Sequence, residues 1–313
     1  MASPQAVLAF LTQANARGER AALIVLTNVE GGAARGVGTM MGVTERGTWL
    51  GSLSGGCTEA ALVTEAQRVI ASGKAELLRI GAGSPLIDIR LPCGSGIDLL
   101  IVPDPDAEML ADAGLCLAKR RPVDLVFSRS GRIGLRADDA AEVTGWHGDD
   151  FHLRINPQLR LVIAGHGEEV TALAALTLAW GAETRVLTPD QNLAAALGSV
   201  VTLLGSPAAN PALALDRWSA LVMLFHDHDW ETALLVQALG QQPFYIGAMG
   251  SPATHARRLE ALAEAGVAPS AASRITGPIG LIPAARDPQT LALSVLAQVV
   301  AAYNLGGSAA PVG

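Results

Sequence analysis

The stretch Arg160-Leu161-Val162-Ile163-Ala164-Gly165-His166-Gly167-Glu168-Glu169-Val170 decides the fold that we predict for this chain. Its apolar run does not alternate with polar residues, which is typical of a central parallel strand covered on both faces. Gly165 and Gly167 then form a turn whose backbone can approach a bound phosphate, and apolar residues at helical spacing follow. A strand, a glycine turn and a helix in this order predict the first unit of a Rossmann-like, doubly wound parallel sheet.

The same stretch departs from the dinucleotide-binding fingerprint at two places. Val170 stands where the third glycine would allow close contact between helix and strand. The strand expected at Thr184 to Leu187 is followed by Thr188, where a ribose-binding carboxylate is usual, and Asp190 comes only two residues later. The pattern therefore predicts the fold and leaves open whether NAD(P) binds.

A chain of 313 residues can hold two ordinary domains, each with its own core. Residues 137–157 are acidic and irregular, and Asn156 precedes a proline that disfavours helix, whereas a buried strand comes directly after. We therefore expect an N-terminal mixed α+β domain over residues 1–156. A C-terminal Rossmann-like domain is expected over residues 157–313.

The composition excludes several classes of protein. A net charge of −7 without a basic stripe disfavours nucleic acid as a partner. Half of the residues are apolar, but no apolar run is long enough to span a bilayer, so we expect a protein with extensive buried interfaces and no membrane contact. No secretory signal is visible, and three cysteines do not make a disulfide framework, so a cytoplasmic location is expected.

Two cysteines lie on glycine-rich turns of the first domain. Cys57 follows Gly55 and Gly56 at a strand-to-helix turn, where unpaired amides and the helix dipole favour a thiolate. Cys93 lies between Pro92 and Gly94 at an expected hairpin tip, where a ligand can approach it. The alternative for Cys57 is a small residue that packs beside two glycines. No CxxC or CxxH spacing is present, which argues against a structural zinc site.

A third glycine-rich segment precedes both cysteine turns. The span Glu30 to Gly38 contains four glycines, and Arg35 is its only cation. Glycine permits a positive φ and a close approach of the backbone to a ligand, and arginine suits an anion. A ligand-binding loop and a flexible hairpin tip are both consistent with this pattern.

Two more strand ends in the second domain carry candidate binding residues. His226-Asp227-His228-Asp229 follows the apolar strand Ala220 to Phe225, at the sheet edge where ligands of parallel sheets bind. This cluster could hold an anion or a metal, or cap a helix beginning near Trp230 with Asp229 as the cap; we favour the anion or the cap. Gly250 and Ser251 follow the next strand and suit phosphate, or form an ordinary connection.

With these segments identified, the chain resembles the XdhC/CoxI family of accessory proteins for xanthine dehydrogenase and related molybdenum hydroxylases. The matching stretches follow the family order along nearly the whole chain. They are Ser54-Gly55-Gly56-Cys57-Thr58-Glu59, Leu91-Pro92-Cys93-Gly94, Gly165-His166-Gly167, His226-Asp227-His228, Tyr245-Ile246-Gly247-Ala248-Met249-Gly250-Ser251 with His255-Ala256-Arg257-Arg258-Leu259, and Gly277-Pro278-Ile279-Gly280-Leu281 with Ala285-Arg286. The chain departs from the family where a carboxylate is usual, at Thr188 and at Ile282.

The resemblance implies a chaperone, rather than a catalyst, that binds molybdenum cofactor (molybdopterin). It implies that the protein holds this cofactor while a cysteine desulfurase supplies sulfur, and inserts it into an apo molybdenum hydroxylase of the xanthine dehydrogenase or aldehyde oxidoreductase type. The high apolar content adds the expectation of a homodimer. An NAD(P)-dependent oxidoreductase and a scaffold that only contacts its client are the alternatives.

Residues expected to contact the cofactor come from both domains. Cys93 and Cys57 are expected to contact the metal or its sulfur, since soft ligands suit such a centre. The full expected set is Arg35, Gly55, Gly56, Cys57, Cys93, Gly94, Gly165, Gly167, His226, Asp227, Gly250 and Ser251.

Overall fold

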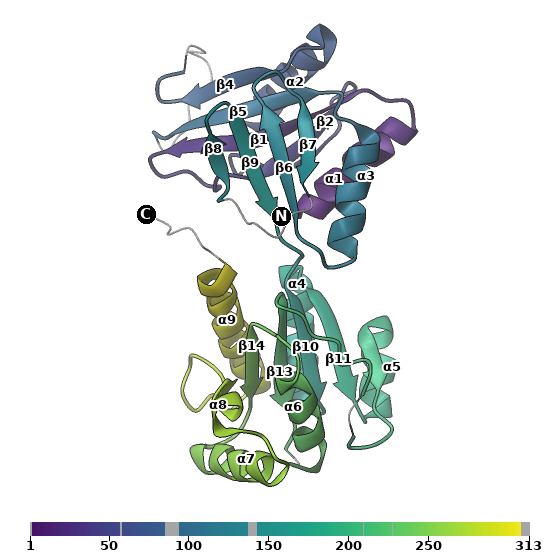
Figure 1. Ribbon diagram of the computed structural model, residues 1–313, viewed down its shortest axis with the longest axis vertical. Coiled ribbons are helices and arrows are strands. Elements are labelled where there is room, and N and C mark those ends of the chain that lie inside the picture. Colours follow the sequence, from purple (N-terminus) through teal and green to yellow (C-terminus); the bar gives the residue numbers. More distant parts are fainter. Residues whose placement is uncertain are drawn as a thin grey trace. The chain divides into compact units, whose positions relative to one another are not determined.

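The computed structural model of the chain describes residues 2–56, 58–84, 94–136, 143–208, 210–226 and 228–307. The chain divides into two compact units, Met1–Pro157 and Gln158–Gly313, shown in Figure 1. Each unit has hydrophobic cores of its own. Within the described residues, no helix combines the length and the apolar character needed to cross a membrane.

The described residues of the first unit form two antiparallel sheets and three helices. The five-stranded sheet has the order β3-β2-β1-β5-β4, and the four-stranded sheet has the order β7-β6-β9-β8. The elements are α1 (Pro4–Ala16), β1 (Ala21–Glu30), β2 (Met40–Thr44), β3 (Trp49–Gly51), α2 (Glu59–Ser72), β4 (Glu76–Gly81), β5 (Gly96–Pro103), α3 (Ala107–Ala118), β6 (Val123–Ser128), β7 (Ile133–Arg136), β8 (Gly145–His147) and β9 (Asp150–Ile155).

The central strand β1 is buried on both faces. Leu23 and Val25 lie in a core formed with α1, α3 and the four-stranded sheet. Ile24 and Leu26 point the other way, into a core formed with α2. The alternation of a strand places successive side chains on opposite faces, so a continuous apolar run serves both cores. The five-stranded sheet is thus the middle layer of this unit (Figure 1).

The stretch that the sequence predicts to be irregular, residues 137–157, contains two strands. β9 pairs with β6 and β8, and its alternate residues Phe151, Leu153 and Ile155 are buried in the core shared with β1. The prediction of irregular structure was wrong for these residues. The alternation of apolar and polar residues in β9 is short and is flanked by acidic residues, so it gave no clear strand signal. Packing against the larger sheet stabilises this strand.

The second unit is a single parallel sheet with helices on both faces. Its strand order is β12-β11-β10-β13-β14-β15. The elements are β10 (Arg160–Gly165), α4 (Glu168–Trp180), β11 (Glu183–Thr188), α5 (Gln191–Leu197), β12 (Val201–Leu203), β13 (Ser219–Leu224), α6 (Glu231–Leu239), β14 (Tyr245–Ala248), α7 (Pro252–Glu264), α8 (Pro269–Ala272), β15 (Ile275–Thr276) and α9 (Pro288–Gly307).

This order is that of a Rossmann-like sheet, and the predicted fold class is confirmed. β10 lies at the centre between β11 and β13, and all six of its residues are buried. Helices α4 and α9 pack on one face of the sheet, and α6 and α7 pack on the other (Figure 1). From β10, the chain adds β11 and β12 on one side and then β13, β14 and β15 on the other side. Such folds bind ligands at this switch point, between β10 and β13.

Candidate functional site

Three glycine-rich segments of the first unit meet at one end of the five-stranded sheet. They are the loop after β1, the turn before α2 and the turn before β5. A Cβ atom placed on Gly31 would lie 3.6 Å from Cα of Ser95, and one on Gly55 would lie 3.6 Å from Cβ of Ala34. An added Cβ would therefore be in ordinary van der Waals contact, which places the loop after β1 directly beside both turns. Segments more than 60 residues apart in the chain, at Gly31 and Ser95, thereby line one place.

The turn before α2 needs glycine for its backbone conformation. Gly55 and Gly56 adopt φ values of +80° and +109°, which side chains with a Cβ rarely tolerate. A Cβ on Gly56 would meet no atom within 4 Å, so the space beside it is open. Position 56 therefore needs glycine because of its positive φ and not because of nearby atoms. The backbone of Gly56 is accessible to a ligand.

The carboxylate of Glu59 holds this turn together, a role that the sequence analysis missed. Its Oε1 accepts hydrogen bonds from the Ser52 hydroxyl at 2.7 Å and the Ser54 amide at 3.1 Å. Its Oε2 accepts from the Ser54 hydroxyl at 2.7 Å and the Thr58 amide at 3.2 Å. The Ser52 hydroxyl in turn accepts from the Gly55 amide at 3.1 Å. One side chain therefore ties both ends of the turn to the first residue of α2.

Glu59 is ionised within this network. The residue is only 7% exposed, and burial raises the pKa of its carboxyl, but the hydrogen bonds from Ser52 and Ser54 outweigh burial and lower the pKa from 4.5 to about 2. Its charge also engages the amide of Thr58, the N-cap residue of α2. This amide is one of the helix-start donors that were expected to favour a thiolate at the preceding cysteine.

Arg35 lies in the loop after β1 with part of its guanidinium unused. Its Nη1 donates to the carbonyl oxygen of Ala34 at 2.9 Å. Its Nε is buried and has no hydrogen-bond partner, and Arg35 forms no ion pair with any described residue. A buried donor without a partner is costly, so an acceptor brought by a ligand would stabilise this conformation. Arg35 is thus the side chain of this region best suited to an anion.

Arg79 fixes the two strands from which the loop and the second turn emerge. Its guanidinium pairs with Glu30, donates to both carboxylate oxygens of Asp98 at 3.1 Å, and donates to the carbonyl oxygen of Ala82 at 2.9 Å. A Cβ on Gly96 would lie 2.4 Å from its Nη2, so only glycine leaves room for it. The charge of Arg79 is therefore already matched by carboxylates, unlike that of Arg35.

Three of the expected site residues, Cys57, Cys93 and Asp227, lie outside the described residues. Gly94, which follows Cys93, adopts a φ of +70° at the second turn. Cys116 is a free thiol that is partly buried and packs against the core. Among the described residues, no three His, Cys, Asp or Glu side chains gather closely enough to hold a metal ion.

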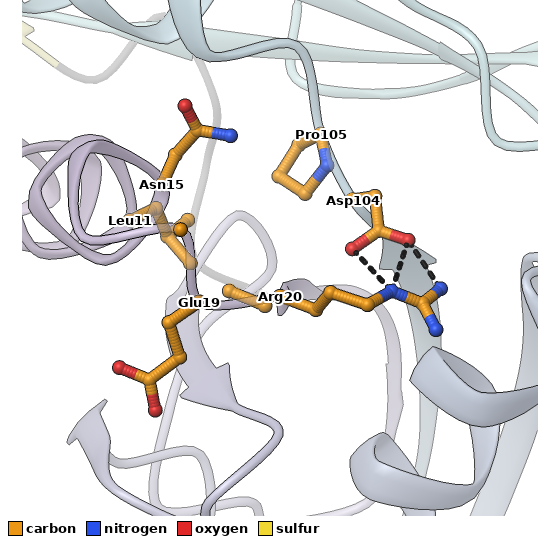
Figure 2. A pocket seen from close by; sticks show the side chains of 8 residues that line it. Leu11, Asn15, Glu19, Arg20, Asp104 and Pro105 are labelled. Carbon is orange, nitrogen blue, oxygen red and sulfur yellow. Dashed lines mark hydrogen bonds and ion pairs between the residues drawn. The ribbon is translucent and has the colours of Figure 1, made fainter.

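The first unit also has a shallow cavity of about 270 Å³ near the start of β1, shown in Figure 2. The Arg20 guanidinium donates to the Asp104 carboxylate on one side of it, with Nε to Oδ2 at 3.1 Å, Pro105 lies next to Asp104, and Asn15 comes from α1. β1 begins here at Ala21 and ends at Glu30 beside the glycine loop. The cavity is therefore at the other end of the strand from the three turns.

In the second unit, Gly165 at the end of β10 and Gly167 just after it lie close to other atoms of the protein. A Cβ on Gly165 would lie 2.6 Å from the carbonyl oxygen of Leu224, so this glycine allows β10 and β13 to lie close together. Gly167 precedes α4 with a φ of +90°, and a Cβ there would lie 3.0 Å from a carboxylate oxygen of Glu169. Glu168 and Glu169 both lie in the first turn of α4, where a bound diphosphate would need positive charge.

The positions that depart from the dinucleotide fingerprint are occupied in ways that do not suit a dinucleotide. Val170 is fully buried in the core between α4 and the sheet. Thr188 is also fully buried, and its hydroxyl accepts a hydrogen bond from the Asp190 amide at 3.1 Å. Asp190 itself caps α5, accepting from the Asn192 and Leu193 amides. Its carboxylate is thus engaged by the helix where a ribose would need it.

The strand end after β13 brings aromatic and imidazole rings together. The rings of His166 and His226 are 5.9 Å apart, and His226 Nε2 lies 3.7 Å from Glu169 Oε1. The expectation that Asp229 caps the next helix was wrong. A short 3-10 turn, His228–Trp230, comes first, and α6 begins after Trp230, whose ring stacks on Phe225.

The strand end after β14 is occupied by capping and by a buried ion pair. The Ser251 hydroxyl accepts from the Thr254 amide at 3.1 Å and so caps α7. Gly250 packs against Thr254, where a Cβ would come within 2.7 Å of Cγ2. The Arg258 guanidinium pairs with Glu231 at 3.0 Å, both side chains being 2% exposed.

His255 completes this ion-pair cluster. Arg258 Nη1 lies 3.3 Å from Nδ1 of His255, so this nitrogen must be the acceptor. Burial and the Arg258 charge lower the pKa of His255. The imidazole is therefore neutral near pH 7 and offers no charge to a phosphate.

Comparison with known proteins places both units in one family. The sequence profile of the XdhC and CoxI family matches residues 14–81, and that of the XdhC Rossmann domain matches residues 161–299. The chain is 36% identical to the molybdenum cofactor insertion chaperone PaoD of Escherichia coli (strain K12) over 295 residues, which are 94% of this chain and 86% of PaoD.

A solved structure shares the whole fold. A protein from Bacillus halodurans, described as a xanthine dehydrogenase, superimposes with a TM-score of 0.77 at 22% identity, covering 97% of this chain and 98% of that one. Similarity at this level of identity shows the fold.

Proposed function

This chain belongs to the XdhC and CoxI family, and from that premise we propose that it is a molybdenum cofactor chaperone that delivers its cargo to an apo-enzyme. The name of PaoD, a relative similar over almost the whole chain, supports this proposal. The observation that carries it is the meeting of three glycine-rich segments at one end of the five-stranded sheet, around Gly31, Gly55 and Ser95.

The described residues suit a cargo that is anionic and rich in hydrogen-bonding groups. Gly55 and Gly56 expose backbone in a conformation that only glycine readily adopts. Arg35 offers a buried, unpartnered Nε and a charge that no described carboxylate matches. A pterin with a phosphate tail needs such backbone and such a cation. Gly94, at the turn before β5, also has a positive φ.

The finer roles extend this proposal. Cys57 and Cys93 contact the metal or its sulfur, because thiolates are soft ligands. The protein holds the cofactor while a cysteine desulfurase supplies the terminal sulfur, and the client is a molybdenum hydroxylase of the xanthine dehydrogenase or aldehyde oxidoreductase type. It acts in the cytoplasm as a homodimer. In the second unit, the strand ends at Gly165, Gly167, His226, Gly250 and Ser251 contact the phosphate of the cofactor or dock a partner. Asp227, outside the described residues, shares this role.

Anaerobic titration of the purified protein with molybdenum cofactor tests the proposal. We expect one cofactor to be retained per chain through gel filtration and passed to a purified apo molybdenum hydroxylase, which then gains activity. Cys93→Ala and Cys57→Ala should each shorten retention, whereas the matched control Cys116→Ala, in the core-packed α3, should not. Absence of cofactor binding by the wild-type protein refutes the chaperone function, and unchanged retention in both turn variants refutes only the thiolate role.

A further inference from the structure

We propose that the loop of residues 32–37 is a phosphate-binding subsite, with Arg35 as its cation, and that it holds the phosphate end of the cargo. The inference rests on the proposed function, since the phosphate in question is that of the molybdenum cofactor. It assigns an orientation: the phosphate lies on the loop after β1, and the pterin ring lies toward the turn before α2.

The loop offers a series of free backbone donors. None of the amides of residues 32–37 donates a hydrogen bond to any described residue. The next amide along, that of Gly38, is the first to be engaged, donating to the Leu26 carbonyl oxygen at 2.8 Å. Consecutive unpaired amides in a glycine-rich turn form a concave cluster of donors of the kind that binds anions. The space beside Gly32 and Gly36 is open, since a Cβ on either would meet no atom within 4 Å.

The cation is placed within this run of amides. Arg35 keeps its Nε buried and without a partner, while Nη1 is held by the Ala34 carbonyl oxygen at 2.9 Å. Phosphate oxygens accept charge-assisted hydrogen bonds from arginine, often two at once. The other arginine of this sheet end, Arg79, is matched by Glu30 and Asp98 and has no charge to spare. The phosphate is therefore drawn to Arg35.

The opposite side of the site repels a phosphate and suits an uncharged ring. Glu59 is ionised and lies behind the turn before α2, so a second anion there would meet a like charge. Thr58 is 5% exposed, and its hydroxyl is buried without a partner. Its amide donates to the Ser54 hydroxyl at 3.0 Å, and the neighbouring Gly55 lies beside Ala34 of the loop, where an added Cβ would be 3.6 Å from the Ala34 Cβ. A pterin edge, with its ring nitrogens and carbonyl, can pair with such a hydroxyl.

The test uses the fluorescent oxidised pterin prepared from molybdenum cofactor, with its phosphate intact or removed by phosphatase. Fluorescence titration gives the ratio of the two affinities for the wild-type protein and for Arg35→Met, Arg35→Lys and Arg46→Met. The Arg46 variant is a matched control because this arginine is 81% exposed and lies between β2 and β3, at the far end of β2 from the loop. Competition by inorganic phosphate is measured in parallel.

We expect the wild-type protein to prefer the phosphorylated pterin by about tenfold or more, as one charge-assisted contact allows. Arg35→Met should bring this ratio close to one, Arg35→Lys should leave a smaller preference, and Arg46→Met should leave it unchanged. Equal affinity of the wild-type protein for both pterins overturns the phosphate subsite while leaving the proposed function intact. A preference that survives Arg35→Met also overturns it. Failure of the protein to bind either pterin overturns it as well. Failure to bind intact cofactor overturns the proposed function instead.

Discussion

Replacing Glu59 by glutamine should destabilise the first unit in a pH-dependent manner. The carboxylate accepts four hydrogen bonds from the turn that carries Gly55 and Gly56, and glutamine keeps one acceptor oxygen and no charge. A shift of the pKa from 4.5 to about 2 corresponds to about 3 kcal/mol of stabilisation at neutral pH. For a unit of this size, such a loss lowers the melting temperature by about 6–12 °C.

The sign of the pH dependence follows from the direction of the shift. Because the pKa of Glu59 is lower in the folded protein, its contribution is complete above pH 4.5 and is lost as the pH falls toward 2. The difference in unfolding free energy between the wild-type protein and Glu59→Gln should therefore fall from about 3 kcal/mol at pH 7 to about 1 kcal/mol at pH 3.

Urea denaturation at both pH values measures this difference, and hydrogen exchange of the amides of α2 assigns it to the first unit. Glu108→Gln is the matched control, since Glu108 also lies in the first turn of a helix of this unit but is exposed. We expect the control to cost no more than about 1 kcal/mol. A Glu59→Gln effect as small as that of the control, or one of equal size at pH 7 and pH 3, would refute the role of the buried carboxylate.

Further predictions concern the second unit. Arg258→Ala should cost about 3–5 kcal/mol in urea denaturation, because it removes the cation that pairs with the buried Glu231 carboxylate; a cost below about 1 kcal/mol would contradict this. Gly165→Ala should cost about 1–3 kcal/mol, since its Cβ would press on the Leu224 carbonyl oxygen; a neutral substitution would contradict the packing role. NADPH should not bind, because Glu169 and its neighbour occupy the diphosphate position; fluorescence titration giving a Kd below about 1 mM would contradict this.

The parallel sheet could be predicted because its buried central strands are visible in the sequence as apolar runs. Leu161 to Ala164 and Ala220 to Phe225 are uninterrupted apolar runs, as strands covered on both faces require, and they became β10 and β13. The second sheet of the first unit could not be predicted in the same way. β9 has polar residues on one face and acidic neighbours, so only its pairing with β6 and its burial against β1 make it a strand.

The glycine turns of the candidate site could be predicted one by one, but their arrangement in space could not. The glycines at Gly31, Gly55 and Gly94 indicated turns, yet only the sheet order brings the start of β5 beside the end of β1. Glu59 was missed because its role depends on a turn folding back on a helix start. A serine at position 54 and a glutamate at the first helical position are a weak signal of this, resembling a reversed capping arrangement.

The glycines after β10 separate the prediction of a fold from the prediction of a ligand. Gly165 is needed whether or not a nucleotide binds, because the carbonyl oxygen of Leu224 in β13 lies 2.6 Å from where its Cβ would be. A phosphate also needs a helix start without other negative charges, and here Glu169 lies in the first turn of α4. The glycine motif thus predicts the fold, because the backbone packing needs glycine there, whereas the neighbouring side chains determine which ligand can bind. By the same criterion the loop at Arg35, where the donors are free and the cation is unmatched, is the better place in this chain to seek a bound phosphate.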